Sequence, residues 1–405
     1  MDITVSKYRY ELEMFITKIR SILGERDDGD LLEIIESEFF GSEILQSISA
    51  NDVNSFIENV FYRVKSKYGI IEPLLNDEEI NEIMVNGPND IFVEKNGRIV
   101  ELPMAFLSEK ELEDMIRVFA SDVHREINEV NPIVDARLEN GYRVNGVLKN
   151  IALNGPILTI RKFNKNSITM KELVAFESLT KECAEFLKKM VKARYSIMIS
   201  GSTSSGKTTF LGALTGYINA DQERVIIIED SAELKVEMLK NAVHMECKGS
   251  NSLGKGEVNM AKLIKTSLRM RPDRIIVGEV RGKEIKDMIQ AMSTGHSGSM
   301  STGHSGSVLG MLNRLEALYL MNSDIPIMSV KRQIADALEI LVHLERNAMG
   351  KRKVVEVAEL VGLDGDKYIL NSLFKESDYG NLDRTDNDLI NDKKLRKWSY
   401  SDKLR

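Results

Sequence analysis

The sequence predicts an α/β protein in which a parallel-sheet domain follows an α+β domain and a small helical module. Two observations lead to this prediction. In the second half of the chain, short apolar strands alternate with helices, which is typical of a parallel sheet covered on both faces. In the first half, amphipathic helical stretches are followed by short apolar runs separated by turn signals.

Length and composition indicate a soluble chain of two or three domains. The chain has 405 residues, against ~150 for an average domain. A net charge of −7 argues against a surface that binds nucleic acid strongly, although a local basic patch is compatible with it. Cys183 and Cys247 are too few for a disulfide framework, which favours a reducing compartment.

Neither a signal-peptide pattern nor a run of ~20 apolar residues is evident. We therefore expect a cytoplasmic protein whose membrane association is peripheral and comes through partners or the protein surface.

Residues 1–68 are expected to form the helical module. Apolar side chains recur at helical spacing, so that Leu12, Phe15 and Ile19 share one face and Phe56 and Val60 share another. Such faces form a core in most proteins, but a partner-docking role for the module stays open.

Residues 69–163 are expected to form the α+β domain. Asn86-Gly-Pro88 and Lys95-Asn-Gly97 are strong turn signals between strand-like runs. A helix is predicted over 108–121, with Ser108 as its N-cap.

Residues 164–365 are expected to form the parallel-sheet domain. Buried strands are predicted over 196–199, 225–228 and 275–277, and helices over 180–192, 258–269, 308–320 and 329–342. Residues 366–405 are rich in Asp, Lys, Asn and Ser, which predicts a loosely ordered polar tail.

The motif GSTSSGKT lies between the strand over 196–199 and an amphipathic helix. This is the context of a P-loop, whose backbone N–H groups and helix N-terminus bind phosphate. A Gly/Ser-rich surface turn is the alternative, and the strand–loop–helix context argues against it. Lys207 is predicted to reach the β- and γ-phosphates of ATP, and the Thr208 hydroxyl to hold Mg²⁺. The predicted nucleotide-binding residues are Gly201, Ser202, Thr203, Ser204, Ser205, Gly206, Lys207, Thr208 and Thr209.

Two carboxylates follow predicted strands. Glu229 ends the strand over 225–228, where ligands of parallel sheets bind, so it is a candidate Mg²⁺ ligand; helix capping by Asp230 and Ser231 is the alternative. Glu279 follows the strand over 275–277, expected one strand over from the P-loop, with Gly278 at the usual Walker B aspartate position. Glu279 is therefore the candidate to orient and deprotonate the attacking water, against a role as a surface glutamate.

A near-tandem repeat, STGHSGS, contains His296 in its first copy and His304 in its second. Either imidazole would be able to hydrogen-bond a γ-phosphate or Glu279, and a flexible duplicated loop is the alternative. Arg137, Arg143 and Arg161 lie outside the parallel-sheet domain and are candidates to supply positive charge to the phosphates. Most surface arginines have no such role.

In this order the motifs resemble the secretion ATPases of the type II/IV superfamily, most closely the CpaF/TadA branch that powers tight-adherence and Flp-type pili. The resemblance runs from about Tyr68 to Leu363. It rests on NEIMVNGP at 81–88, VDAR at 134–137, RVN at 143–145, LTIRKF at 158–163, the P-loop, IIEDSAEL at 227–234, RPDRIIVGEVRG at 271–282 and the paired TGH segments.

The resemblance implies a RecA-like P-loop ATPase domain, a hexameric ring, and an inner-membrane platform protein as partner, with no direct nucleic-acid binding. It implies Glu279 as the catalytic glutamate, Arg143 and Arg161 as phosphate-approaching arginines, and His296 and His304 as a His box. The chain departs from the family at Ser305-Gly-Ser307, and residues before about 45 and after about 365 have no clear counterpart.

The predicted function is therefore ATP hydrolysis that drives a secretion or pilus machine. Three alternatives stay open: a type IV secretion ATPase that moves effector proteins or DNA complexes, a nucleic-acid translocase on the same core, and a nucleotide-gated scaffold without turnover.

Overall fold

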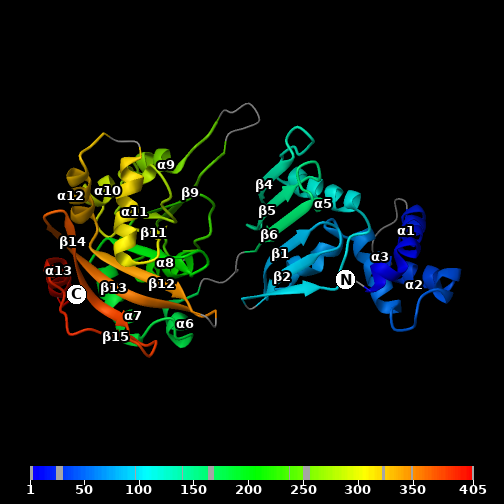
Figure 1. Cartoon of the computed structure of the whole chain (residues 1–405), viewed down its shortest axis with the longest axis horizontal. Coiled ribbons are helices and arrows are strands. Elements are labelled where there is room, and N and C mark those ends of the chain that lie inside the picture. Colours follow the sequence, from blue (N-terminus) through cyan, green and yellow to red (C-terminus); the bar gives the residue numbers. More distant parts are fainter. Residues whose placement is uncertain are drawn as a thin grey trace. The chain divides into compact units, whose positions relative to one another are not determined.

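The computed structural model describes residues 3–23, 31–95, 97–138, 140–162, 168–236, 238–249, 256–321, 324–347 and 350–403. The chain forms two compact units, residues 1–165 and 166–405, and each is described by itself (Figure 1). The domain boundary expected between 163 and 164, and the centre of the turn expected at 95–97, lie outside the described residues.

The first unit begins with helices around an aromatic core. They are α1 (Ile3–Leu23), α2 (Leu31–Phe40) and α3 (Val53–Lys65), with the short helices η2 (Glu43–Gln46), η3 (Gly69–Ile71) and α4 (Glu72–Asn76). The rings of Phe15, Phe39 and Phe56 pack with centroids 5.3–6.0 Å apart. Leu12, Phe15, Ile19, Phe56 and Val60 are all buried, which confirms the predicted helical faces.

The rest of the first unit is a six-stranded antiparallel sheet with one long helix. Its strands are β1 (Ile80–Asn86), β2 (Ile91–Lys95), β3 (Arg98–Leu102), β4 (Ile133–Arg137), β5 (Arg143–Val147) and β6 (Ile157–Arg161), in the order β3-β2-β1-β6-β5-β4. Helix α5 (Glu109–Asp122) begins after Ser108, whose hydroxyl accepts from Glu111 N at 3.1 Å, as predicted. α5 packs closely on β5, since a Cβ on Gly146 would lie 2.6 Å from Ile116 Cγ2.

The second unit contains a nine-stranded sheet. Its strands are β7 (Ile197–Gly201), β8 (Val225–Glu229), β9 (Ala242–Glu246), β10 (Arg274–Val277), β11 (Met300–His304), β12 (Ile340–Arg346), β13 (Arg352–Asp364), β14 (Lys367–Glu376) and β15 (Leu382–Arg384). The order is β15-β14-β13-β12-β7-β11-β10-β8-β9, and the strands from β12 to β9 are parallel.

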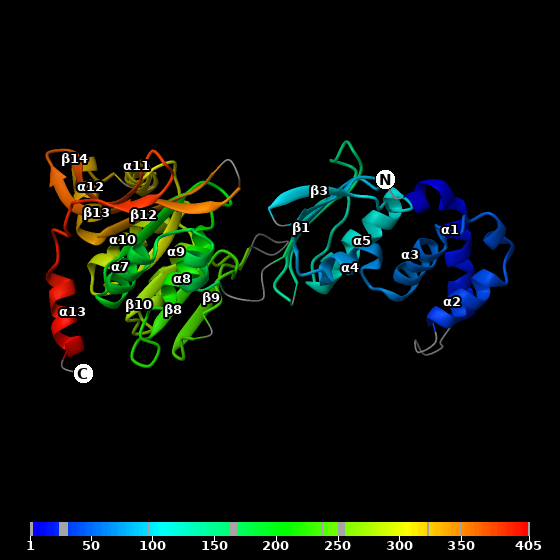
Figure 2. The ribbon, with the colours of Figure 1, turned by 90° about the horizontal axis from the view of Figure 1, so that it is seen from below.

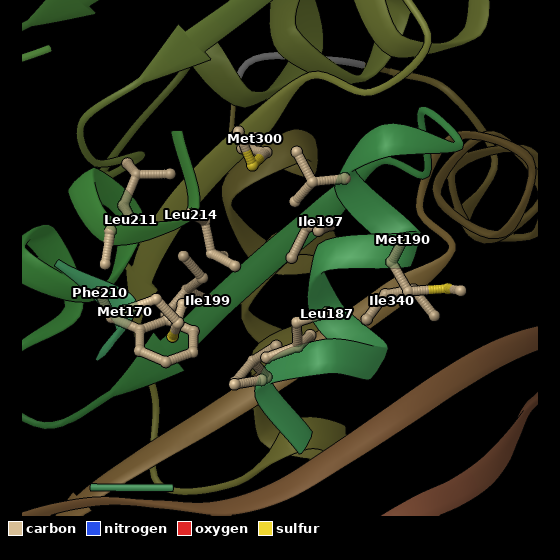
Figure 3. Close-up of a cluster of buried hydrophobic side chains, with 14 of the residues drawn as sticks. Met170, Leu187, Met190, Ile197, Ile199, Phe210, Leu211, Leu214, Met300 and Ile340 are labelled. Atoms are coloured by element: carbon tan, nitrogen blue, oxygen red, sulfur yellow. The ribbon is translucent and has the colours of Figure 1, made fainter. Parts of the chain in front are cut away.

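Helices cover both faces of this sheet, as predicted. Ile197 and Ile199 pack with α6 (Met170–Ala175), α7 (Lys181–Lys192) and α8 (Lys207–Thr215), and Figure 3 shows them among side chains of these helices. Met198, which alternates with them on β7, packs with the opposite layer. That layer comprises α9 (Met260–Ser267), α10 (Glu284–Ser293), α11 (Val308–Leu320) and α12 (Ile327–Ala337).

Two sequence predictions for this unit are wrong. The helix expected over 329–342 ends at Ala337, and the apolar run that begins at Ile340 forms β12, a central strand beside β7. A short buried strand and a buried helical segment have the same apolar signature, so periodicity did not separate them.

The expected loose tail is also folded, since β14, β15 and α13 (Lys393–Lys403) lie within 366–405. Figure 2 shows α13 in red at the C-terminal end of this unit. One anchor of the tail is Glu359 of β13, which is 1% exposed and accepts hydrogen bonds from Ile390 N at 2.8 Å, Asn391 N at 2.6 Å and Asn371 Nδ2 at 3.0 Å. None of the described helices combines the length and apolarity that crossing a membrane requires.

We expect Glu359→Gln to loosen the segment from 385 to 403. Glutamine has one acceptor oxygen in place of two and adds an N–H group that faces other donors, so the change should cost about 1–3 kcal/mol. Limited proteolysis and hydrogen exchange of the tail would measure it. Glu356→Gln on the same strand, which accepts from the Ser372 hydroxyl, is the matched control. Equal protection of the tail in both variants would contradict the anchoring role.

Candidate active site

The P-loop connects β7 to α8 in a tight backbone arrangement. A Cβ on Gly201 would lie 2.4 Å from the carbonyl oxygen of Leu344 on β12, so only glycine fits against that strand. Gly206 has φ +91°, in the left-handed region that favours glycine, and immediately precedes α8. Arg352 Nε donates to Ser204 O at 2.9 Å and holds the loop from the side of β13.

The loop has the donors that a phosphate requires. The Ser205 hydroxyl is buried and has no hydrogen-bond partner among the described residues. Helix α8 begins at Lys207, so its N-terminal end, with Thr208 in the first turn, faces the loop. These features fit the polyphosphate of ATP.

Lys207 is held by neutral acceptors of its own loop. Its Nζ donates to Gly201 O at 3.1 Å and to Ser202 O at 2.7 Å, and the residue is 6% exposed. Burial lowers the pKa of Lys207, and the charge of Glu279 opposes that shift. In this conformation the ammonium group is therefore hydrogen-bonded to backbone carbonyl groups of the P-loop.

His304 lies between Lys207 and Glu279. Its Nδ1 is 3.2 Å from Lys207 Nζ, and its Nε2 is 2.8 Å from Glu279 Oε1. An ammonium group only donates, so Nδ1 accepts, and the proton of the neutral ring lies on Nε2, which faces Glu279 Oε1 at close distance but without hydrogen-bond geometry. Desolvation lowers the pKa of His304, Glu279 opposes the shift, and Lys207 and Arg281 reinforce it.

The sheet order explains this bridge and corrects one expectation. β10, which precedes Glu279, is not next to β7, because β11 lies between them. His304 ends β11 and pairs in register with Gly201. Lys207 and Glu279 are therefore one strand apart. The His304 imidazole, from the strand between them, fills this gap and contacts both side chains.

Arg281 is a residue of the site that the sequence analysis did not assign. Its Nη2 donates to Glu279 Oε2 at 2.7 Å, and its Nη1 is 3.9 Å from Asp230 Oδ2. Glu279 therefore has His304 on one oxygen and Arg281 on the other. The sequence signal that could have identified Arg281 is its position two residues after Glu279.

Glu229 is buried and bound to its own loop. Its Oε1 accepts from Glu233 N at 2.9 Å and from Leu234 N at 3.0 Å. A Cβ on Gly278 would lie 3.0 Å from Glu229 Cγ, so the Glu229 side chain fills the space beside the Walker B glycine. The second carboxylate of the site thus comes from β8 instead of β10. Its role as a Mg²⁺ ligand stays a prediction. A contact with Mg²⁺ through a water molecule would leave its hydrogen bonds to Glu233 N and Leu234 N intact.

The structure separates the two histidines of the repeat. His296 precedes β11, and its Nδ1 is 3.2 Å from Ala291 O. Ser299 O, three residues later, accepts from Ile197 N at the amino end of β7. Since β11 and β7 are parallel, His296 lies at the edge of the sheet opposite the P-loop. The sequence repeat therefore does not correspond to a structural pair, and the catalytic role expected for His296 is not supported in this chain.

His343 is a second residue that the sequence analysis missed. It lies on β12 opposite Ser200, whose Oγ is 2.8 Å from His343 Nδ1, directly below the P-loop. Burial lowers its pKa. His343 was missed because the sequence analysis did not predict the strand β12 that contains it.

Arg143 and Arg161 belong to the first unit and are brought together there. Arg137 lies opposite Arg143, and Arg143 lies opposite Arg161, on three neighbouring strands. Val144 and Gly146 point toward α5, so the arginines point to the other face. On its other side Arg161 lies opposite Glu82 of β1, so this row of arginines ends against a carboxylate within the sheet.

Other ligand chemistries have little support in the described part of the chain. No three His, Cys, Asp or Glu side chains gather there as a metal site. Cys183 and Cys247 are free thiols, and burial raises the pKa of Cys247 to about 11.

The sequence matches the family model described as "Type II/IV secretion system protein" over residues 64–372. This chain belongs to the type II/IV secretion system ATPase family. At the level of the family, the predictions of an ATPase and of a RecA-like ATPase domain behind an N-terminal domain are confirmed.

Two relatives and two solved structures illustrate the match. An uncharacterized protein of Methanocaldococcus jannaschii is 40% identical over 59% of this chain, and the match spans only 34% of that protein's length. The conjugal transfer protein TrbB of Rhizobium radiobacter is 34% identical over 73% of this chain and 88% of its own.

The crystal structure of the ATPase DotB of Yersinia pseudotuberculosis covers 74% of this chain and 79% of that chain, with 18% identity and a TM-score of 0.53. The structure of the pilus retraction motor PilT with bound ADP covers 82% of this chain and 88% of that chain, with 18% identity and a TM-score of 0.51. These two likenesses show the fold.

We expect the His304 imidazole to titrate below its ordinary pKa of 6.5 when no nucleotide is bound. Because burial lowers the folded-state pKa, the contribution of the neutral ring to stability is fully present above about pH 6.5 and is lost as the pH falls from that value through the folded-state pKa. Lys207→Ala should raise the midpoint, and Glu279→Gln should lower it further. NMR titration of the imidazole resonances would measure the order.

His296, at the other edge of the sheet, is the internal control, since neither variant should move its resonance. A His304 midpoint that is the same in wild type and in both variants would contradict the Lys207–His304–Glu279 arrangement.

Proposed function

We propose that this chain hydrolyses ATP and, as a ring-forming motor, drives a secretion or pilus-assembly machine in the membrane. The observation that supports this most directly is the continuous set of contacts from Lys207 through His304 to Glu279 at the mouth of a P-loop. It joins a phosphate-binding cation to a carboxylate base through one imidazole.

Different residues of the second unit bind the phosphates, activate the attacking water and hold Mg²⁺ in this proposal. ATP draws Lys207 away from Gly201 O and Ser202 O toward its β- and γ-phosphates, and the loop N–H groups and the Ser205 hydroxyl bind the phosphate oxygens. Glu279 orients the attacking water and accepts its proton, and Arg281 fixes the carboxylate. Thr208, and Glu229 through water, would hold Mg²⁺, which neutralises charge on the phosphate oxygens.

Arg143 and Arg161 are part of the proposal as a source of positive charge for the γ-phosphate. Their support within the first unit is their direct pairing on β5 and β6, next to Arg137. An added arginine typically changes the rate of such a reaction by ~10³–10⁵. The hexameric ring, the platform-protein partner and the cytoplasmic face of the inner membrane come from the family resemblance and belong to the same proposal.

The branch of the family is the finer part of the proposal. The motif series favours CpaF/TadA-type pilus assembly. TrbB, a conjugal transfer protein, is the relative that supports the other candidate, a type IV secretion ATPase. Both use the same ATPase site and differ in what the motor moves.

We expect Glu279→Gln to bind ATP with near wild-type affinity and to lower kcat by about 10²–10⁴, because the amide cannot accept the proton of water. Lys207→Ala should abolish turnover and weaken binding as well. Phosphate release and binding of a fluorescent ATP analogue separate the two effects. Glu246→Gln is the matched control, since Glu246 ends β9 at the same edge of the sheet. Normal turnover in Glu279→Gln would refute its role.

We expect the ATPase rate of the full-length protein to rise when the cytoplasmic part of an inner-membrane platform protein is added, and not when DNA is added. Contact with the machine would favour the closed, hydrolytic state of the motor. Steady-state phosphate release with each addition, and with Glu279→Gln as the zero-rate control, would test this. Stimulation by DNA alone would favour a nucleic-acid translocase instead.

A further inference from the structure

A basic cavity lies on the outer side of the layer that contains α9 and α10. Its volume is about 650 Å³, which is within the usual range of ligand sites. Five cationic side chains line it, and Asp287 is the one carboxylate among its lining residues. The cations are Lys262, Lys265 and Arg269 of the α9 segment and Lys283 and Lys286 of the α10 segment.

Most of this charge has no counterion among the residues that the structure describes. Lys265 Nζ is 3.5 Å from Asp287 Oδ1. Among the described residues, Lys262, Arg269, Lys283 and Lys286 make no ion pair. Four uncompensated cations around one cavity repel each other, in a chain whose net charge is −7. A multivalent anion in the cavity would remove that repulsion.

The backbone adds to the same field. α9 leads into β10, α10 follows β10 and leads into β11, and the two strands are parallel. Both helices therefore run in the same direction, with their N-terminal ends toward the carboxyl edge of the sheet. Asn259 caps α9 by accepting from Lys262 N at 3.1 Å, and Lys283 precedes the first residue of α10. Two positive helix ends thus lie at the Lys262 and Lys283 end of the cavity.

This cavity is separate from the P-loop. The apolar face of α8 packs on the side of the sheet that includes Ile197 and Ile199. The apolar faces of α9 and α10 pack on the opposite side, with Met198 and Ile226. The sheet therefore lies between the cavity and α8.

We propose that the cavity between α9 and α10 is a second anion site, which binds the phosphate groups of a compact, multiply charged phosphate ester or diphosphate. Lysine ammonium groups act as point charges for phosphate oxygens, and the Arg269 guanidinium is able to pair with two of them. The source of the phosphate is either a free diphosphate or the headgroup of an anionic lipid.

Glu284, which follows the lining residue Lys283 in sequence, contacts the backbone of the candidate active site. Its Oε1 accepts from Gly282 N at 2.7 Å and from the backbone N of Arg281, the residue that holds Glu279. Anion binding in this cavity depends on its charge and shape and not on ATP hydrolysis.

Calorimetric titration of the full-length protein with inorganic pyrophosphate at low salt tests the site. The double variant Lys262→Glu/Lys286→Glu should lose one binding site, or weaken it by about tenfold or more, while the P-loop site is unchanged. Lys262→Gln/Lys286→Gln should give an intermediate loss. Lys171→Glu/Lys181→Glu, with the same charge change on exposed residues of α6 and α7, should bind like wild type.

Vesicles of phosphatidylglycerol in phosphatidylcholine distinguish the source. Binding that depends on Lys262 and Lys286 to these vesicles but not to pyrophosphate would assign the phosphate to a lipid. Circular dichroism of each variant verifies that it is folded.

Three outcomes would overturn the proposal. The first is unchanged binding of both probes in the glutamate variant. The second is a poly-glutamate peptide that binds the cavity as tightly as pyrophosphate, since the site would then recognise carboxylates. The third is an oligonucleotide that displaces pyrophosphate at equal phosphate concentration, which would assign the cavity to nucleic acid. Since turnover is not measured, failure of this site leaves the Glu279 test unaffected.

Discussion

The parallel register of β7, β11 and β10 is the constraint on which the candidate site depends. It aligns Gly201 with His304, and it brings the end of β10 to the same edge, so that Lys207, His304 and Glu279 come within hydrogen-bond distance. Ser200 and His343 continue the same edge through β12. A shift of one residue in β11 would point the imidazole to the other face of the sheet and break the connection.

Packing, as well as chemistry, determines which strands supply the carboxylates of the site. Gly278 leaves room for the buried Glu229 side chain, and a larger residue there would meet Glu229 Cγ at 3.0 Å or less. The two positions are therefore coupled, because an aspartate at 278 would require the Glu229 side chain to shift by a few tenths of an ångström. Glu229 then organises the loop to Leu234 through backbone N–H groups, which leaves Glu279 as the carboxylate directed at Lys207 through His304.

The sequence was sufficient for the P-loop, the Ser108 cap, the parallel sheet and the carboxylate after β10, because each has a local pattern with a physical cause. It was insufficient where tertiary packing decides. β12 has the apolar signature of a helix, and the tail is held by residues distant in sequence, among them Glu359, Tyr195 and Glu339. The STGHSGS repeat suggested two equivalent histidines, but a strand separates them, so that equal sequences occupy opposite edges. Arg281 could be read from the sequence, but only the structure shows that it pairs with Glu279.

The neutral state of His304 connects the resting site to the proposed cycle. In this conformation the Lys207 ammonium group has all three of its contacts within the protein, with Gly201 O, Ser202 O and His304 Nδ1. When phosphate draws Lys207 away, His304 loses both the donor at Nδ1 and the nearby charge that lowers its pKa. A phosphate oxygen in that place favours a protonated ring, whose Nδ1 donates to phosphate while Nε2 faces the Glu279 carboxylate. The imidazole would thereby report to the base whether the phosphate is present, and this requires a single histidine on the strand between them.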